Sequence, residues 1–263
     1  MKIAWLTPLS VDSSIGRCSV LITNELANTA DVDIWHPPAR QLWQTKLRRR
    51  ELAALGNVEL DVFQRYDAVV YNFGNYLPFH REIFEVAQRV SGVAILHDFV
   101  LHHFFVELYV HTLKLPAAYQ RAMRRYYGEE GEKVAICSLN GKQPPVWSTD
   151  SVVSFPLFEE ALKRCFGVVV HSEFLRGKVK KSFAGPVTKL FLPHDVTALG
   201  TSLTRQQLGL AADRIVILTV GHVNPNKQVE SVIRALGTNQ DLRGRIHYVL
   251  AGPIEPKSRE QLM

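Results

Sequence analysis

The stretch Asp213-Arg-Ile-Val-Ile-Leu-Thr-Val-Gly-His-Val-Asn-Pro-Asn-Lys-Gln-Val-Glu230 combines an apolar run, a turn and the start of a helix. The run from Ile215 to Val220 is short, rich in β-branched residues and ended by Gly221. Such a run predicts a strand buried on both faces of a parallel sheet. Apolar residues then recur at helical spacing, at Val229, Val232, Ile233 and Leu236.

The turn between strand and helix places Lys227 at the amino end of the expected helix. Free backbone N–H groups and the positive end of the helix dipole favour an anion at that position, and the lysine adds a mobile positive charge. The pattern fits a diphosphate site at this turn, with Lys227 as its cation. It fits equally well an ordinary β–α turn with a solvated lysine, and the spacing alone leaves both interpretations open.

A resemblance to a known family rests on the same residues. The segment Gly221-His-Val-Asn-Pro-Asn-Lys227 resembles the Gly-Arg-x-x-x-x-Lys element of GT-B glycosyltransferases, particularly the retaining enzymes of glycosyltransferase family 4. In that family the arginine and the lysine bind the diphosphate of a nucleotide sugar. Lys227 matches, whereas His222 stands where arginine is usual, and histidine is charged only part of the time near neutral pH.

Length and composition indicate an ordinary globular protein. A chain of 263 residues is long enough for one large domain, or for one domain and part of another. The net charge of +6 suits anionic ligands, including sugar nucleotides, lipid phosphates and nucleic acid, without choosing among them. Cys18, Cys137 and Cys165 show neither metal-ligand spacing nor a disulfide framework, which favours a reducing, cytoplasmic location. The first apolar run is too short for a signal peptide, and no run reaches transmembrane length.

Apolar runs and turn residues predict an α/β fold: a doubly wound, mainly parallel Rossmann-like sheet in residues 1–196, a linker at 197–212, and an incomplete second Rossmann-like domain at 213–263. The resemblance identifies the first as the acceptor-side domain and the last as the start of the donor nucleotide-binding domain. The expected strands are residues 2–7, 32–35, 66–75, 92–96, 167–172, 187–192, 215–220 and 245–253. The expected helices cover residues 17–27, 80–90, 104–135, 155–166, 173–181 and 204–210.

The loop Pro8–Gly16 follows the first expected strand. It has one glycine and no G-x-G-x-x-G, so it fails as a dinucleotide fingerprint. The resemblance implies a glycine-containing loop here that binds the donor sugar, with Gly16 as the matching residue.

A cluster of polar residues follows the fourth expected strand, in Ile95-Leu-His-Asp-Phe-Val-Leu-His-His103. Three interpretations stay open: a metal site, since histidine and carboxylate suit zinc or iron; a helix cap formed by Asp98; and the rim of an active site. The resemblance favours the rim, because family 4 enzymes often have His-Asp at this place, and it implies that His97 contacts the donor sugar while Asp98 orients the sugar or the acceptor hydroxyl. Asn75 and His80, after the third strand, are expected to contact the acceptor.

The segment Arg40–Arg50 is basic and contains Trp43, which is expected to be exposed. It fits a patch for an anionic membrane surface or a phosphorylated lipid acceptor. It also fits the solvated face of a helix, which is what charge runs usually are.

The resemblance implies a retaining glycosyltransferase that moves a sugar from a nucleotide sugar to a saccharide or a lipid-linked acceptor, without a cofactor or metal. Two glutamates that bind the donor in the family are expected beyond Met263, within the roughly 100 further residues that a complete second domain needs. A two-strand remnant of that domain leaves sheet edges and apolar helix faces uncovered, so residues 214–263 are expected to be poorly stable alone. The alternatives are a non-catalytic GT-B binding protein and another GT-B enzyme, such as a sugar-nucleotide epimerase or a phosphorylase. Nucleic-acid binding is not expected, because the arginines are dispersed.

Overall fold

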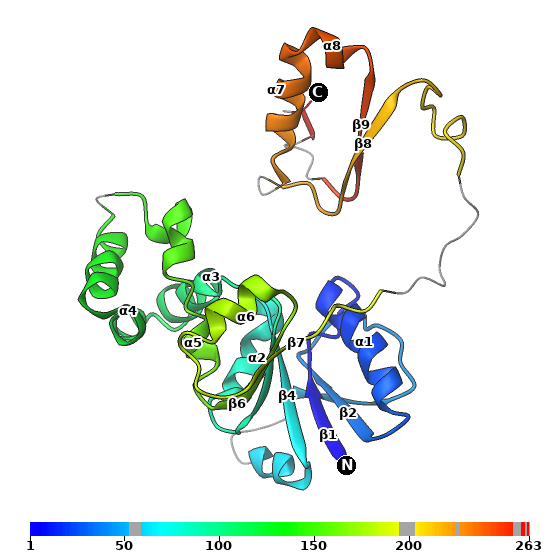
Figure 1. Cartoon of the computed structure of the whole chain (residues 1–263). Coiled ribbons are helices and arrows are strands. Elements are labelled where there is room, and N and C mark those ends of the chain that lie inside the picture. The colour runs from blue at the N-terminus through cyan, green and yellow to red at the C-terminus, as the bar shows by residue number, and fades with distance from the viewer. Residues whose placement is uncertain are drawn as a thin grey trace. The chain divides into compact units, whose positions relative to one another are not determined.

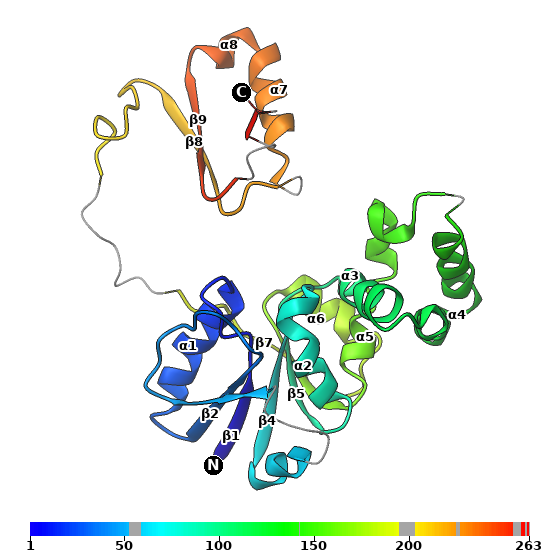
Figure 2. The same ribbon diagram turned by 180° about the vertical axis from the view of Figure 1, so that it is seen from behind.

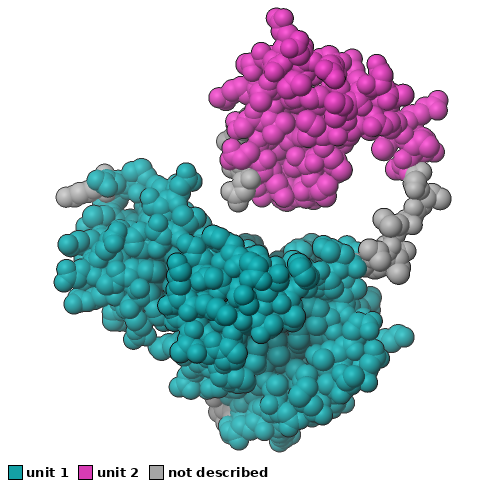
Figure 3. Space-filling view, in the orientation of Figure 1, with its two compact units in different colours: residues 1–195 teal, residues 196–263 magenta. Residues whose placement is uncertain are grey.

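A computed structural model describes residues 1–52, 59–141, 143–194, 203–224, 227–254, 259–260 and 262. The chain divides into two compact units, Met1–Asp195 and Val196–Met263 (Figure 3). The first part of the predicted linker, up to residue 202, lies outside the described residues.

Seven strands of the described residues in unit 1 form one parallel sheet, in the order β3-β2-β1-β4-β5-β6-β7. They are β1 (Lys2–Leu6), β2 (Asp31–His36), β3 (Arg48–Glu51), β4 (Ala68–Phe73), β5 (Gly92–Leu96), β6 (Cys165–Val170) and β7 (Val187–Lys189). The chain builds outward from β1 to β3 and then returns to add β4 on the other side of β1. This order is that of a Rossmann-like α/β fold, and the prediction of a mainly parallel sheet is confirmed.

Helical segments connect the strands of unit 1. They are α1 (Ser14–Leu26), η2 (Glu59–Arg65), α2 (Leu77–Ala87), α3 (His102–Val106), the π-helical η3 (Glu107–Thr112), α4 (Pro116–Leu139), η4 (Val146–Ser148), η5 (Asp150–Ser154), α5 (Phe158–Ala161) and α6 (Glu173–Val179). Figures 1 and 2 show α3 and α4 at the side of the unit away from α1. The residues between β5 and β6 therefore form a helical lobe beside one half of the sheet.

Burial follows the apolar runs of the central strands. Leu6 of β1, Tyr71 of β4 and Leu96 of β5 are fully buried and belong to one hydrophobic core. The helical prediction for residues 104–135 is confirmed in outline, and Pro116 begins α4, where its missing N–H is not needed.

Several predicted boundaries are wrong. The first helix begins at Ser14 instead of residue 17, because Ser13 caps it by accepting from the Gly16 N–H. The second covers Leu77–Ala87 and not residues 80–90, since Pro78 favours the first helical turn. The predicted helix 155–166 shrinks to α5, because residues from Cys165 onward already pair in β6. The strand predicted for 187–192 ends at Lys189.

The Arg40–Arg50 segment is not a helix. Its last residues form β3, which pairs with β2, and Trp43 is partly buried rather than exposed. The reason is a buried carboxylate on β2: Asp33 lies 3.0 Å from Arg50 Nε and 3.4 Å from Arg48 Nη1. These contacts fix the segment at the sheet edge, whereas Arg40, Lys46 and Arg49 remain exposed.

Asp33 is held by a second element as well. The Tyr66 hydroxyl donates to Asp33 Oδ2 at 2.6 Å and accepts from Trp35 Nε1 at 3.2 Å. Burial and the neighbouring Asp33 raise the pKa of Tyr66 to about 12, so the hydroxyl keeps its proton. One buried carboxylate thus ties β2, β3 and the start of β4 together.

Unit 2 contains β8 (Ile215–Val220), α7 (Val229–Thr238), α8 (Gln240–Arg243) and β9 (Ile246–Ala251), with β8 parallel to β9. The predicted strands and the helix after Lys227 are confirmed. The predicted burial of β8 on both faces is wrong: Ile215, Leu218 and Val220 are 55%, 55% and 62% exposed. Within the described residues β8 pairs with β9 alone, and so small a sheet cannot enclose both faces. The predicted helix 204–210 consists of turns.

No helix in the described part of the chain combines the length and apolar character needed to cross a membrane.

Replacing Tyr66 with phenylalanine tests the Asp33 network. The change removes a hydrogen bond to a carboxylate and leaves Trp35 Nε1 without its partner, so we expect the free energy of unfolding to fall by about 1.5–3 kcal/mol. Urea unfolding followed by tryptophan fluorescence measures it, because all 4 tryptophans lie in unit 1. Tyr76→Phe is the matched control, since Tyr76 is 58% exposed. Equal stability of the two variants would contradict the network.

Candidate functional site

The candidate site lies at the carboxyl edge of the unit 1 sheet. Because the strands are parallel, the residues that follow β4, β5 and β6 meet at one edge. These residues are Asn75, the pair His97-Asp98, and His171. The same edge receives the loop after β1 and the first turn of α1, at the point where the strand order reverses between β1 and β4.

A cavity of about 640 Å³ opens at this edge. Its wall consists of the first turns of α1, the His97-Asp98 pair and the segment that follows β7. The lining residues are Ser14, Ile15, Arg17, Cys18, Leu21, His97, Asp98, Leu192, Pro193 and His194. The two residues expected to act in catalysis therefore lie together in a cavity with one arginine and one further histidine.

Gly74 is the point where the parts of the site approach most closely. A Cβ at this position would lie 2.7 Å from His80 Nε2, 2.8 Å from Ile15 Cδ1 and 3.2 Å from Asp98 Oδ2. Only glycine leaves room for α1 and the turn after β5 to come this near to the end of β4. Sequence reasoning did not single out Gly74, although its place directly after a buried strand was a usable signal.

His97 is anchored by a buried amide. Its Nε2 lies 3.0 Å from Asn72 Oδ1, and the Asn72 amide nitrogen donates to the Leu6 carbonyl at 3.0 Å. Burial, with added repulsion from His171 and His80, lowers the pKa of His97 to about 3. The ring of His97 is therefore neutral at physiological pH.

His171 lies beside His97, with ring centroids 4.8 Å apart. Its Nδ1 is 3.0 Å from the Leu190 carbonyl, so this nitrogen carries the proton. Its Nε2 is sealed from solvent and has no hydrogen-bond partner. The histidine pair joins the ends of β5, β6 and β7.

His80 does not reach the surface of the site. It is 2% exposed, and its Nδ1 bonds the Asn72 carbonyl at 3.0 Å. Burial lowers the pKa of His80 to about 4, although the backbone bond acts in the opposite sense. The residue expected to contact an acceptor instead supports the turn at Asn72–Gly74 from below.

Asp98 does not cap the following helix, and that interpretation is wrong. The helix α3 begins only at His102, and Asp98 Oδ2 accepts from the Asn75 backbone N–H at 2.8 Å. The amide of Asn75 takes the capping role, because its Oδ1 accepts from the Phe104 N–H at 3.0 Å. Asp98 is exposed and leaves Oδ1 available at the cavity.

The remaining histidines of the cluster hold the helical lobe. His102 is fully buried between the Phe155 carbonyl at 2.6 Å and the Tyr119 hydroxyl at 2.9 Å. Burial lowers the pKa of His102 to about 4. His103 bonds the Asn75 amide and the Trp147 carbonyl. Among the described residues, no three histidine, cysteine or acidic side chains are placed to hold a metal ion.

Gly16 lies in the first turn of α1 and does not line the cavity. A Cβ there would lie 2.3 Å from the Pro8 carbonyl oxygen and 3.2 Å from Trp43 Cδ1. Trp43 Nε1 also donates to the Ser13 carbonyl at 3.1 Å. Gly16 thus permits close packing of α1 against the preceding loop.

The second group of predicted residues lies in unit 2. Gly221 has a φ of +103°, and a Cβ there would lie 3.6 Å from Lys227 Nζ. The lysine is exposed and precedes α7 by two residues, so its amine folds back over the end of β8. His222 is exposed in the same turn. Pro225 and Asn226 lie outside the described residues.

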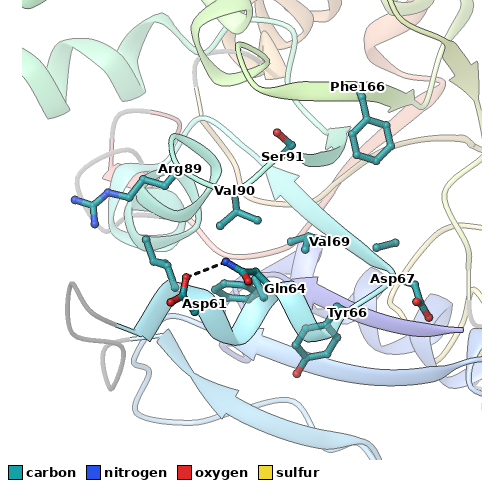
Figure 4. Close-up of a pocket in the computed structure, with 12 residues that line it drawn as sticks. Asp61, Gln64, Tyr66, Asp67, Val69, Arg89, Val90, Ser91 and Phe166 are labelled. Carbon is teal, nitrogen blue, oxygen red and sulfur yellow. Dashed lines mark hydrogen bonds between the residues drawn. The ribbon is translucent and has the colours of Figure 1, made fainter.

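A smaller cavity of about 290 Å³ lies at the amino edge of the unit 1 sheet (Figure 4). Its wall includes Asp67 before β4, Ser91 before β5 and the exposed ring of Phe166. The polar groups there bond locally: Asp61 accepts from Gln64 at 3.0 Å, and Asp67 accepts from the Lys2 backbone N–H at 2.6 Å. The predicted site residues all lie elsewhere.

No protein-family model matches the chain, and a search of the curated proteins finds no significant match.

Substituting Gly16 by alanine tests the packing of α1. The added methyl group overlaps the Pro8 carbonyl, and we expect the free energy of unfolding to fall by about 1–3 kcal/mol. Gly177→Ala in α6 is the matched control, because nothing lies within 4 Å of the new methyl group. Alanine there should raise stability by about 0.5–1 kcal/mol. If urea unfolding showed that both substitutions lower the free energy of unfolding, or that both raise it, this account of Gly16 would be refuted.

The neutral histidines predict a dependence of stability on pH. The ordinary pKa is 6.5, and burial lowers the pKa of His80 and His102 to about 4. The unfolded chain therefore binds more protons between these values, and stability that is fully present above pH 6.5 is lost as the pH falls toward 4. We expect each histidine to contribute a slope of up to about 1.4 kcal/mol per pH unit.

Urea unfolding of His102→Gln from pH 7 to pH 4.5 measures this contribution. The variant should show a shallower loss of stability than the parent, whereas the exposed control His111→Gln should keep the parent slope. An unchanged slope in His102→Gln would mean that His102 is not held neutral.

Proposed function

We propose that the chain is a retaining glycosyltransferase that uses a nucleotide sugar as donor and a saccharide or lipid-linked acceptor. The observation that supports it most is the placement of His97 and Asp98 in the 640 Å³ cavity, beside the amino end of α1. In Rossmann-like sheets ligands bind at the carboxyl edge where the strand order reverses, and this cavity lies there. Polar groups that converge in a large cavity are the ordinary mark of a binding site.

In this proposal the unit 1 cavity binds sugar hydroxyl groups. His97 contacts the donor sugar, and Asp98 orients the sugar or the hydroxyl of the acceptor. Asn75 holds both Asp98 and the start of α3 in place. Its backbone N–H donates to Asp98, and its side-chain amide oxygen caps α3. His80 supports the site indirectly, through the Asn72 carbonyl.

Unit 2 by itself offers groups suited to a diphosphate. Lys227 precedes α7, and its amine together with the N–H groups of the first turn of that helix forms an arrangement that favours phosphate oxygens. A positive charge held at the leaving diphosphate lowers the barrier to departure of the nucleotide. His222, exposed in the turn after β8, adds a hydrogen-bond donor. The leaving phosphate takes the proton of the acceptor hydroxyl, so the proposal needs neither a metal nor a cofactor.

The basic segment Arg40–Arg50 could also contact an anionic membrane surface, with fewer free cations than its sequence suggests. Arg48 and Arg50 are engaged with Asp33, which leaves Arg40, Lys46 and Arg49 exposed for an anionic surface. Each such charge adds about 1 kcal/mol near an anionic bilayer. A lipid-linked acceptor on that surface fits the proposal, as does a saccharide in solution.

The test is release of free nucleoside diphosphate from a panel of UDP-, GDP- and ADP-sugars, with and without mono- and oligosaccharide acceptors. Calorimetry with the same nucleotides measures binding on its own. Turnover with one nucleotide supports the proposal. Binding without turnover would favour the non-catalytic binding protein, and neither result with any nucleotide would reject both.

Two substitutions then assign the roles. Lys227→Ala removes a charged hydrogen bond of about 1.5–3 kcal/mol, so we expect affinity for the nucleoside diphosphate to fall roughly 10- to 100-fold. Arg234→Ala, at an exposed position of α7, is the matched control. His97→Ala should keep nucleotide affinity and lower turnover by at least about 10-fold. Unchanged affinity in the first variant, or unchanged turnover in the second, would remove that residue from the proposal.

A further inference from the structure

We infer that Asn72 is a positioning residue that holds His97 as a neutral imidazole with its proton on Nε2, so that Nδ1 meets the ligand only as a hydrogen-bond acceptor. The inference rests on a chain of hydrogen bonds that crosses the three central strands. The ligand that we assign to Nδ1, a hydroxyl group, rests on the proposed function and specifies which group of the substrate His97 contacts.

The first step fixes the orientation of the Asn72 amide. Asn72 is 1% exposed on β4, and one side of its amide faces the backbone carbonyl of Leu6 on β1 at 3.0 Å. A carbonyl oxygen only accepts hydrogen bonds, so the amide nitrogen must lie on that side. The carbonyl oxygen of the amide, Oδ1, must therefore face away from β1.

The second step fixes the proton of His97. Asn72 Oδ1 lies 3.0 Å from His97 Nε2, and this oxygen too can only accept. Nε2 must donate and carries the proton. A neutral imidazole has one proton, so Nδ1 is left bare.

Nδ1 of His97 is left without a hydrogen-bond partner in the described part of the protein. No described residue donates to it, and it is not among the polar atoms that are sealed from solvent without a partner. His97 lines the 640 Å³ cavity. His171 and His80 interact with the His97 ring, and the other titratable groups that line the same cavity are Asp98, Arg17, Cys18 and His194.

The bare nitrogen selects the ligand group. An acceptor in a site needs a partner with a proton to donate, which a sugar hydroxyl has and a diphosphate oxygen at neutral pH does not. Nδ1 of His97 therefore accepts a hydrogen bond from a substrate hydroxyl and cannot bind the phosphate oxygens of the substrate.

Nitrogen-15 NMR of the full-length chain labelled on histidine tests the tautomer directly. Long-range proton–nitrogen correlations distinguish a protonated Nε2 from a protonated Nδ1 and from imidazolium, and the signal that disappears in His97→Gln identifies the residue. We expect the Nε2–H tautomer at pH 7. A protonated Nδ1, in either the neutral ring or the imidazolium, would overturn the inference.

Variants of Asn72 separate positioning from a merely structural role. Asn72→Ala removes the acceptor, so the Nδ1–H tautomer of His97 should gain population. Asn72→Asp keeps an acceptor oxygen and should retain the Nε2 proton while raising the pKa of the His97 ring. Asn28→Ala, an amide in the turn after α1, is the control and should leave the His97 signal unchanged. If Asn72→Ala does not fold, the parent spectrum and Asn72→Asp still decide the question.

Titration of the parent with glucose and with dimethyl phosphate, a phosphate that has no O–H at pH 7, tests the ligand class. Glucose should shift the His97 Nδ1 resonance and dimethyl phosphate should not. A shift with dimethyl phosphate alone, or with neither probe, would withdraw the hydroxyl assignment. The tautomer is measured without ligand, so its failure is distinguishable from a failure to find transferase activity.

Discussion

The parallel pairing of β1 with β4 is the contact on which the candidate site depends. The chain leaves β1 in one direction and returns on its other side with β4, so the turns after both strands meet at one edge. The register aligns Leu6 with Tyr71, and the bond from Asn72 to the Leu6 carbonyl crosses the same strand pair. A slip of one residue would turn Asn72 to the opposite face of the sheet and break that bond. The register of β1 and β4 therefore also determines which nitrogen of His97 carries the proton.

The edge built on this pairing combines buried neutral dipoles with two charged side chains, Arg17 and Asp98, that line the cavity. Its buried histidines meet backbone carbonyls and amide or hydroxyl groups, and each of these partners is neutral. Burial lowers the pKa of His80 and His97, because a charged imidazole would lose more hydration than these dipoles replace. Fixed neutral donors and acceptors recognise hydroxyl groups by direction. The same groups bind phosphate poorly, because they offer no compensating charge.

Predictions from the sequence succeeded where the cause was local and failed where it was distant. Apolar runs located the strands, and a turn before a helical pattern located Lys227 and α7. Arg50 was misplaced because its partner, Asp33, lies 17 residues away and is recognised only when β2 and β3 pair. The close approach of Gly16 to the Pro8 carbonyl could not be predicted from the sequence, because the fold sets that contact. The sequence placed His97 and Asp98 at the rim, but it could not show that His80 lies beneath it.

The predicted site residues of unit 2 offer different hydrogen-bonding groups from those of unit 1. Its predicted residues are a glycine with positive φ and an exposed lysine whose amine lies over that glycine. A mobile ammonium group with three donors at a helix start matches phosphate oxygens, whereas a bare imidazole nitrogen does not. The turn after β8 therefore offers a donor, whereas Nδ1 of His97 offers an acceptor. Each of these sites is matched to a different chemical group by its own residues, because a lysine ammonium can only donate and an unprotonated imidazole nitrogen can only accept.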